Sequence, residues 1–195
     1  MKRTPLFLTV FSLLFCVITA SVIAWYGYFS AVTVQEKPVG PYTMVYRVYV
    51  GSSSGVGPLL AEIHASLVGE FQVENPVAFG LYYDDPKTTP PDECRILVGC
   101  IIEDDQDGDL HAISAKYSVA IFPRGMAIVA DYPYRNKLSV LFGMLKAYPA
   151  LLTYGEEHQI ARKPILEMYD AKRGRIRYVA STAFNDEFLA AYLDL

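Results

Sequence analysis

The chain begins with one long apolar segment. Residues 6–25, LFLTVFSLLFCVITASVIAW, are all apolar or weakly polar, and no charged residue occurs within residues 4–35. At 1.5 Å per residue, this segment covers about 30 Å as a helix, the thickness of the hydrocarbon core of a bilayer. Aromatic residues typical of a membrane–water interface follow it: Trp25, Tyr26 and Tyr28. The pattern predicts a membrane-anchoring helix within residues 1–32.

A cleaved signal peptide is the alternative interpretation of this segment. The basic beginning, Lys2 and Arg3, fits a signal peptide, but the apolar region exceeds the roughly 7–15 residues that signal peptides use. The small-x-small cleavage sequences are also poor, since Ala20-Ser21-Val22 ends in a bulky residue. These features favour a retained single-pass anchor.

Behind the anchor, the pattern changes to short apolar runs separated by polar breaks. Residues 33–41 contain two prolines and are predicted to be a short, extended linker. Residues 44–51 are rich in β-branched and aromatic side chains, which predicts a strand. A helix is predicted after Pro58, because the next apolar residues fall on one face: Leu59, Leu60, Ile63 and Leu67. Two further apolar runs, 76–83 and 95–102, predict two strands.

The same order then repeats. Residues 117–133 predict a strand with a break, and residues 163–170 and 175–181 predict two short closing strands. Between them, residues 136–148 predict a helix, with Pro149 as an interruption. The helix is indicated by apolar residues at i, i+3, i+4 and i+7: Leu138, Leu141, Phe142 and Leu145.

The repeated strand–helix–strand–strand order predicts the fold class. We expect an α+β domain over residues 42–180, with helices on one side of an antiparallel sheet and a groove between the halves. Residues 181–195 lie outside it as an acidic, amphipathic C-terminal segment. In this segment, Tyr192 and Leu195 form an aromatic-x-x-aliphatic pattern. That pattern docks on ubiquitin-like autophagy modifiers by strand addition, but a docking C-terminal helix is the commoner explanation for it.

The charge of the chain disfavours one class of partner. It carries 17 basic and 21 acidic residues, a net charge of −4. Residues 1–32 hold two of the basic residues and no acid, so the remainder is more acidic still. Because a protein that binds a polyanion needs a basic face, we predict no direct nucleic-acid binding.

The cysteines and the glycosylation signals bear on the side of the membrane. Cys16 lies in the anchor, and Cys94 and Cys100 are predicted on one strand about 20 Å apart, beyond the reach of a disulfide. No Asn-x-Ser/Thr acceptor occurs in the sequence. Both observations indicate a reducing, cytosolic environment for the domain.

Motifs for metal binding, cofactor binding and hydrolysis are missing from the sequence. The three histidines show no ligand spacing, and the acidic residues 103–112 do not continue to the bidentate glutamate of a calcium loop. The glycine-rich residues 51–58 lack the lysine of a P-loop, and no serine lies in a nucleophile elbow. We therefore predict no catalytic residue, no metal site and no cofactor.

Glu167 is the most suggestive titratable residue, since it lies within the apolar strand PILEMYD. Tyr169 is two residues further along and on the same face of that strand. If this face is buried, the carboxyl has a raised pKa and can meet a cationic or hydroxylated ligand. The alternative, of equal weight, is that the face meets solvent, as alternation allows. Glu167 and Tyr169 are thus the candidate ligand-binding residues.

Four blocks of the chain, in order, resemble those of one family. They are VYRVYVG…GVGPLLAEI, GLYYDDPKTTPPDECRILVGCII, ADYPY…KLSVLFGMLKAYPALLTY and KPILEMYD, and they extend over residues 32–179. They are similar to the animal testis-expressed, gyrase-inhibitor-like (GyrI-like) membrane proteins, which are single-pass proteins of the endoplasmic reticulum and receptors for reticulophagy. The most specific block is YYDDPKTTPPDECR, whose tyrosine and proline spacing is not general to such domains. The resemblance implies the GyrI-like, or bacterial effector-binding, fold.

The resemblance implies a tethered adaptor and not an enzyme. It implies an endoplasmic-reticulum anchor, a cytosolic domain, and two partners, the ubiquitin-like autophagy modifiers and the valosin-containing AAA ATPase. Two features depart from the family. The chain ends at Leu195 without the family's long tail and its interaction motif, for which Tyr192 and Leu195 would be a weak substitute. Lys2 and Arg3 favour a cytosolic N-terminus by the positive-inside rule, which is opposite to the family's orientation. The unpaired cysteines and the absence of glycosylation acceptors instead support the family's orientation.

The resemblance also implies a role for Glu167. Bacterial relatives of this fold bind amphipathic, often cationic compounds at a carboxylate in the groove, and Glu167 lies on the strand that carries the fold's Glu-x-Tyr element. Some relatives hydrolyse small electrophilic substrates with a Tyr and Glu pair. Hydrolysis by Glu167 and Tyr169 is therefore the alternative to ligand binding.

Overall fold

The computed structural model describes residues 4–25, 28, 31–84, 88–102, 109–160 and 164–181. Helix α1 (Thr4–Trp25) precedes a domain built on strands. The strands are β1 (Val34–Val39), β2 (Tyr42–Val50), β3 (Val77–Tyr82), β4 (Arg95–Ile102), β5 (Ser118–Phe122), β6 (Gly125–Pro133), β7 (Ile165–Asp170) and β8 (Arg175–Ser181). The helices of the domain are η1 (Ser53–Gly55), α2 (Val56–Gly69), α3 (Leu110–Ser114) and α4 (Lys137–Glu157).

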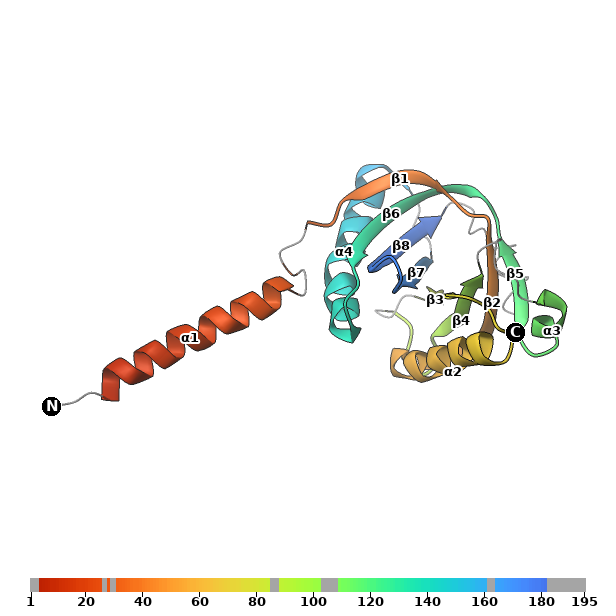
Figure 1. The fold of residues 1–195 in the computed structure, drawn as a ribbon. Coiled ribbons are helices and arrows are strands. Elements are labelled where there is room, and N and C mark those ends of the chain that lie inside the picture. The colour runs from red at the N-terminus through yellow and green to blue at the C-terminus, as the bar shows by residue number, and fades with distance from the viewer. Residues whose placement is uncertain are drawn as a thin grey trace.

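One curled antiparallel sheet of eight strands organises the domain (Figure 1). Its order is β1-β6-β8-β7-β3-β4-β2-β5. The units β2-α2-β3-β4 and β6-α4-β7-β8 are two copies of one pattern, and they meet where β3 pairs with β7. Outward from that seam, the order is β4 then β2 on one side and β8 then β6 on the other. The predicted α+β fold with a duplicated strand–helix–strand–strand unit is confirmed.

Helix α1 is long and apolar enough to cross a membrane. Its residues Phe7–Trp25 have a mean hydropathy of 2.5, and none of them is buried against the rest of the protein. An apolar helix near the N-terminus is also compatible with a signal sequence. The helix is therefore a candidate membrane span, with the signal sequence as the alternative.

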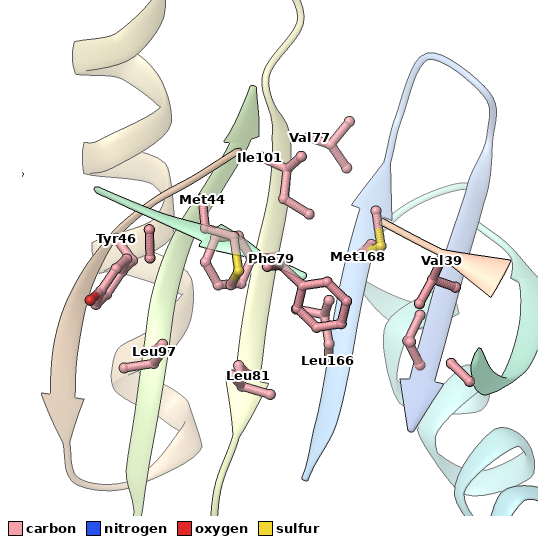
Figure 2. Close-up of a cluster of buried hydrophobic side chains, with 14 of the residues drawn as sticks. Val39, Met44, Tyr46, Val77, Phe79, Leu81, Leu97, Ile101, Leu166 and Met168 are labelled. Carbon is pink, nitrogen blue, oxygen red and sulfur yellow. The ribbon is translucent and has the colours of Figure 1, made fainter. Parts of the chain in front are cut away.

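Alternate residues of the central strands point into two different apolar layers. Val77, Phe79 and Leu81 of β3 lie beside Leu166 and Met168 of β7 in a cluster built from strand residues (Figure 2). The intervening residues point to the opposite face, where α2 packs over one half of the sheet and α4 over the other. Because strand side chains alternate between faces, the seam between β3 and β7 presents its second set of side chains to the space between the two helices.

Strand β1 lies within the segment that the sequence predicts to be a linker, residues 33–41. Residues Val34–Val39 pair with β6 along their whole length. β1 is an edge strand, so Pro38 removes no hydrogen bond to a second neighbour. Pro38 is therefore compatible with a strand at this edge, and Pro41 lies beyond it, between β1 and β2.

Helix α4 differs from its sequence prediction in two respects. It continues through Pro149 to Glu157, without the predicted interruption. The face that it packs on the sheet is made chiefly of small residues four positions apart: Ser139, Gly143, Ala147, Leu151 and Gly155. The leucines whose spacing predicted the helix, Leu138, Leu141 and Leu145, are exposed. The periodic pattern thus located the helix, but it did not mark the buried face.

Candidate functional site

Glu167 lies at the centre of the sheet, on the side that carries the helices. It is in β7 directly opposite Gly80 of β3, at the seam between the two repeats. Its side chain is 0% exposed. A Cβ at Gly80 would meet the ring of Tyr82 at 3.0 Å, so the glycine leaves room for that ring beside the carboxylate. The alternation that left the face of Glu167 undecided is resolved in favour of burial.

Two tyrosines hold the carboxylate of Glu167. The hydroxyl of Tyr148, from α4, donates to Oε1 at 2.5 Å, and the hydroxyl of Tyr169, from β7, donates to Oε2. Tyr82 is hydrogen-bonded to Tyr169 in turn. The site therefore draws on both halves of the sheet and on one covering helix.

A fourth tyrosine adds an unsatisfied donor to the group. Tyr178 of β8 is fully buried and packs edge-to-face on the ring of Tyr148, with 5.8 Å between ring centroids. Among the residues that the structure describes, its hydroxyl has no hydrogen-bond partner. A buried hydroxyl without a partner is uncommon, because desolvation costs free energy that no bond returns.

Burial controls the protonation of this group. It raises the pKa of the Glu167 carboxyl above its ordinary value, and the hydrogen bonds from Tyr148 and Tyr169 oppose that rise only in part. Burial and the charge of Glu167 raise the pKa values of Tyr148 and Tyr169 as well. The tyrosines are consequently hydrogen-bond donors at neutral pH and not phenolates.

The carboxyl group of Glu167 has no cationic side chain beside it in the described part of the chain. Its partners there are the two tyrosine hydroxyls, and no ion pair reaches it. The other buried carboxylate, Asp170, is paired with Arg173 at 3.0 Å and with Arg175 at 3.6 Å. Because a buried charge is ordinarily paired, Glu167 is the exception that calls for a functional explanation.

Two adjoining cavities lie above these tyrosines. The larger, of about 730 Å³, is bordered by α2, α4 and β7, and Tyr169 lines it. The smaller, of about 400 Å³, is lined by Tyr148. Tyr82 and Met144 line both, so the cavities are two parts of one groove between the helices. The Glu167 carboxylate lies beneath this lining, behind the tyrosines that bond to it.

The two parts of the groove differ in charge. The larger part is lined by Lys137 and Lys172 and by Asp170, whose charge is already paired with Arg173 and Arg175. The smaller part is lined by Arg95, but Asp84 neutralises it through two side-chain hydrogen bonds of 2.9 and 2.7 Å. These hydrogen bonds hold the pKa of the Asp84 carboxyl below its usual range. The smaller part of the groove is thus the one better suited to a cationic ligand.

The acidic, proline-rich stretch between β3 and β4 contributes to the smaller part of the groove. Tyr83, Asp84, Pro91 and Cys94 line it, and residues 85–87 lie outside the described residues. In the sequence, this stretch indicates only a stiff, solvated connection. Its position beside Tyr148 follows from the pairing of β3 with both β4 and β7, which sequence reasoning could not supply.

The structure places the sequence-predicted residues as follows. Glu167 and Tyr169 share a face and are hydrogen-bonded to each other. Tyr192, Leu195 and the rest of residues 182–195 lie outside the described residues, as do 103–108 of the acidic loop. Cys16, Cys94 and Cys100 are free thiols, in agreement with the prediction that none pairs.

Sequence reasoning missed Tyr82 and Tyr148. Tyr148 belongs to α4, and the helical pattern alone does not show that this tyrosine points toward Glu167. The signal that could have found it is its place on the helix, one turn beyond Met144 and on the same face.

Comparison with known proteins gives two relatives by sequence, while a scan of protein families gives no match. The chain is 28% identical over 170 residues to the mouse testis-expressed protein 264 homolog, covering 83% of this chain and 52% of that protein. It is 26% identical over 163 residues to human testis-expressed protein 264, covering 80% and 50%. The chain thus spans about half the length of the curated relatives that it matches.

Solved structures show the fold. The C-terminal domain of EcmrR superposes with a TM-score of 0.54 at 11% identity, covering 77% of this chain and 96% of that domain. EcmrR in a complex with DNA gives a TM-score of 0.53 at 11% identity, covering 92% and 69%. SAV2435 bound to tetraphenylphosphonium gives 0.51 at 12% identity, covering 76% and 93%. The chain therefore has the fold of effector-binding domains, behind an apolar N-terminal helix, and it is similar in sequence to testis-expressed protein 264.

Proposed function

We propose that this protein is a membrane-tethered, non-enzymatic domain that binds a small amphipathic cation in the groove between α2 and α4. The observation that carries the proposal is the environment of Glu167. Its carboxylate is fully buried, and among the described residues its partners are two tyrosine hydroxyls and no cationic side chain. A cationic ligand supplies the missing countercharge. The ligand seen in SAV2435, tetraphenylphosphonium, belongs to that chemical class and supports the choice of probe.

The lining of the groove suits such a ligand. Tyr82 and Tyr148 present aromatic rings between the cavity and the carboxylate, and aromatic rings attract cations through their electron-rich faces. The lining of the smaller part also includes apolar side chains: Met144, Ile96 and Ile165. Apolar groups of the ligand lie against these side chains while its charge lies toward Glu167. A cavity of about 400 Å³ falls within the size range of ordinary small-molecule sites.

Titration of the full chain in a nanodisc with tetraphenylphosphonium tests the proposal. We expect saturable binding that weakens by about 30-fold or more in Glu167→Gln, because removing one partner of a buried charge pair costs roughly 2–5 kcal/mol. Protein-free nanodiscs correct for partition of the probe into lipid. Equal affinity in the wild type and in Glu167→Gln would contradict the proposal.

A neutral ligand of similar shape provides the matched control. Triphenylphosphine oxide has aromatic rings but no net charge, so Glu167→Gln should change its affinity far less than that of tetraphenylphosphonium. If both ligands lose affinity equally, the substitution has damaged the groove and not removed a countercharge.

Hydrolysis by Glu167 and Tyr169 is the alternative function for the same residues. The raised pKa of Tyr169 disfavours a phenolate nucleophile at neutral pH. Assays with small electrophilic substrates separate the two functions. Turnover that disappears in both Glu167→Gln and Tyr169→Phe would support hydrolysis, and its absence together with cation binding would support the binding function.

An adaptor role in reticulophagy is a second proposed function, at the level of the whole protein. The similarity to testis-expressed protein 264 and the candidate span support it. In this role, the chain sits in the endoplasmic-reticulum membrane, and Tyr192 and Leu195 contact ubiquitin-like autophagy modifiers. The valosin-containing AAA ATPase is the further partner. Co-precipitation of the full chain with each partner tests this, and Tyr192→Ala should reduce capture of the modifiers alone.

The adaptor role requires the domain to face the cytosol. Glycosylation acceptor sites introduced ahead of Thr4 and, separately, in the acidic residues 103–108 report which end reaches the lumen. We expect modification of the N-terminal site only. Modification of the 103–108 site would place the domain away from cytosolic partners and exclude the adaptor role, while leaving ligand binding untouched.

A further inference from the structure

The outward face of α4 carries an exposed apolar stripe. Leu138, Leu141 and Leu145 are 50%, 52% and 63% exposed, and Pro149 on the same side of the helix is exposed too. The opposite face packs on the sheet through small residues. Large apolar side chains gathered on one exposed helix face mark a contact surface more often than a solvated one. We call Leu138, Leu141 and Leu145 the leucine stripe.

The end of α1 lies against the same helix. The guanidinium of Arg135, two residues before α4, is 4.2 Å from the centre of the Trp25 ring. Tyr28 packs edge-to-face on Phe142 of α4, with 5.8 Å between ring centroids, and its backbone carbonyl accepts a hydrogen bond from Lys146. The leucine stripe is therefore adjacent to the point where the candidate span leaves the domain.

This contact sets the height of α4 relative to a bilayer. Tryptophan and tyrosine at the end of a membrane span lie at the level of the lipid headgroups. Because Trp25 contacts Arg135, just before α4, and Tyr28 contacts Phe142 within it, the helix lies at that level too. Figure 1 shows α4 on the side of the domain nearest α1, inclined to the direction of α1.

The charge of this region complements a membrane surface. Residues 134–155 contain Arg135, Lys137 and Lys146 and no acidic residue, in a chain with a net charge of −4. Helix α4 itself has Lys137 at its N-terminal end, Lys146 in its middle, and Glu156 and Glu157 at its C-terminal end. Leucines on one side beside basic residues are typical of helices that lie in the interface of an anionic bilayer.

We propose that α4 is an interfacial helix, with the leucine stripe inserted among the lipids of the bilayer that α1 spans. The domain then rests on the membrane and does not swing freely from its anchor. Val140 and Met144, on the neighbouring side of α4, line the larger part of the groove. The groove consequently opens beside the bilayer, where amphipathic compounds concentrate.

Site-directed fluorescence on the full chain in nanodiscs tests the proposal. An environment-sensitive dye is attached through Leu145→Cys, and in a second variant through Leu138→Cys, in a Cys16→Ser, Cys94→Ser background. Cys100 remains, since it is fully buried and burial raises the pKa of its thiol to about 12, which prevents labelling. Ile121→Cys on β5 is the matched control. Ile121 is 63% exposed, as is Leu145, but it lies at the other end of the sheet from β1 and α1 (Figure 1).

Quenching decides the outcome. The dye at 145 and at 138 should be quenched by a lipid-borne quencher and shielded from aqueous iodide, several-fold more than the dye at 121. Iodide quenching at 145 and 138 equal to that at 121 overturns the proposal. A dye that is shielded from iodide but untouched by the lipid-borne quencher overturns it as well, since a second copy of the chain or another protein then covers the stripe.

Lipid charge provides an independent readout. Lipid-borne quenching at 145 should increase when phosphatidylserine replaces part of the phosphatidylcholine, and Lys137→Gln should reduce that increase. If quenching does not respond to lipid charge, with or without Lys137→Gln, the basic residues of this region have no role in membrane contact.

Discussion

The two long helices of the domain, α2 and α4, occupy equivalent places in the duplicated fold but pack in opposite ways. Helix α2 buries large aliphatic side chains, Val56, Ile63 and Leu67, over the aliphatic residues and the cysteine of β4: Ile96, Val98, Cys100 and Ile102. Helix α4 buries small residues over Tyr132 and Tyr178, which fill the space instead. The small residues on the buried face of α4 let the helix pack close enough for Tyr148 to reach Glu167, and the leucines of α4 remain on its outer face. Helix α2 thus contributes chiefly to the hydrophobic core, whereas α4 contributes a residue of the site.

Truncation of a buried side chain of α2 should have the largest effect on the free energy of unfolding. Ile63 is fully buried, so Ile63→Ala should lower the free energy of unfolding by about 2–5 kcal/mol, from lost burial and the cavity left behind. Urea unfolding of the full chain in mild detergent, followed by near-ultraviolet circular dichroism, measures this. A change below about 1 kcal/mol would mean that α2 does not form the rigid core described.

Enlargement of the α4 side should come next, with an internal control on α2. A Cβ at Gly143 would clash with the Tyr178 hydroxyl and meet the Tyr132 ring at 3.1 Å, so Gly143→Ala should cost about 1–3 kcal/mol despite the better helix propensity of alanine. Gly69 of α2 has nothing within 4 Å of that position and is not followed by a proline, so Gly69→Ala should stabilise by about 0.5–1 kcal/mol. The same unfolding assay should therefore give opposite signs, and equal signs would refute close packing of α4.

These residues also show where prediction from sequence succeeds. The helix at α4 was predictable because its apolar residues recur at helical spacing, and the strands were predictable from β-branched and aromatic runs. The buried face of α4 was not, because Gly143 and Ala147 carry no hydrophobic signal, and their importance depends on the tyrosines beneath them. The leucine stripe misleads for the same reason, since periodicity does not say whether an apolar face meets a sheet or a lipid.

The site was predictable only in part. Alternation placed Glu167 and Tyr169 on one face of β7, but it could not decide whether that face is buried, because both faces of this central strand are covered. Tyr82 and Tyr148 join them through the β3–β7 pairing and the docking of α4, both of which are long-range contacts. Sequence therefore supplied the charged residue and not its surroundings.

The pH dependence of stability should show the burial of Glu167. Its pKa in the folded chain is raised above the ordinary value of 4.5, so the folded state keeps a proton that the unfolded state has lost. The stabilising contribution of this group is complete below that value and declines as the pH rises through the folded pKa. Unfolding measured from pH 4.5 upward should show Glu167→Gln gaining stability relative to the wild type. A difference that is independent of pH would indicate a solvated carboxyl.

Truncation of the leucine stripe should have the smallest effect on folding. Leu145→Ala removes a side chain that is mostly exposed, so in detergent it should change the free energy of unfolding by no more than about 0.5 kcal/mol. The free energies of unfolding of Leu145→Ala and Ile63→Ala, measured in one assay, compare the outer face of α4 with the buried face of α2. A cost of about 2 kcal/mol or more would show that the stripe packs within the folded domain and not on its surface.

Proton release on ligand binding tests the central claim, that Glu167 is a buried countercharge, most directly. A cation beside the carboxylate favours its charged form and lowers its pKa, so binding should release protons when the pH is near the raised pKa of the free protein. Calorimetric titration of the full chain with tetraphenylphosphonium, in buffers of different ionisation enthalpy and from pH 4.5 upward, measures this release. We predict release in the wild type and none in Glu167→Gln. Binding without proton release at any pH in this range, or equal release in both proteins, would contradict the account.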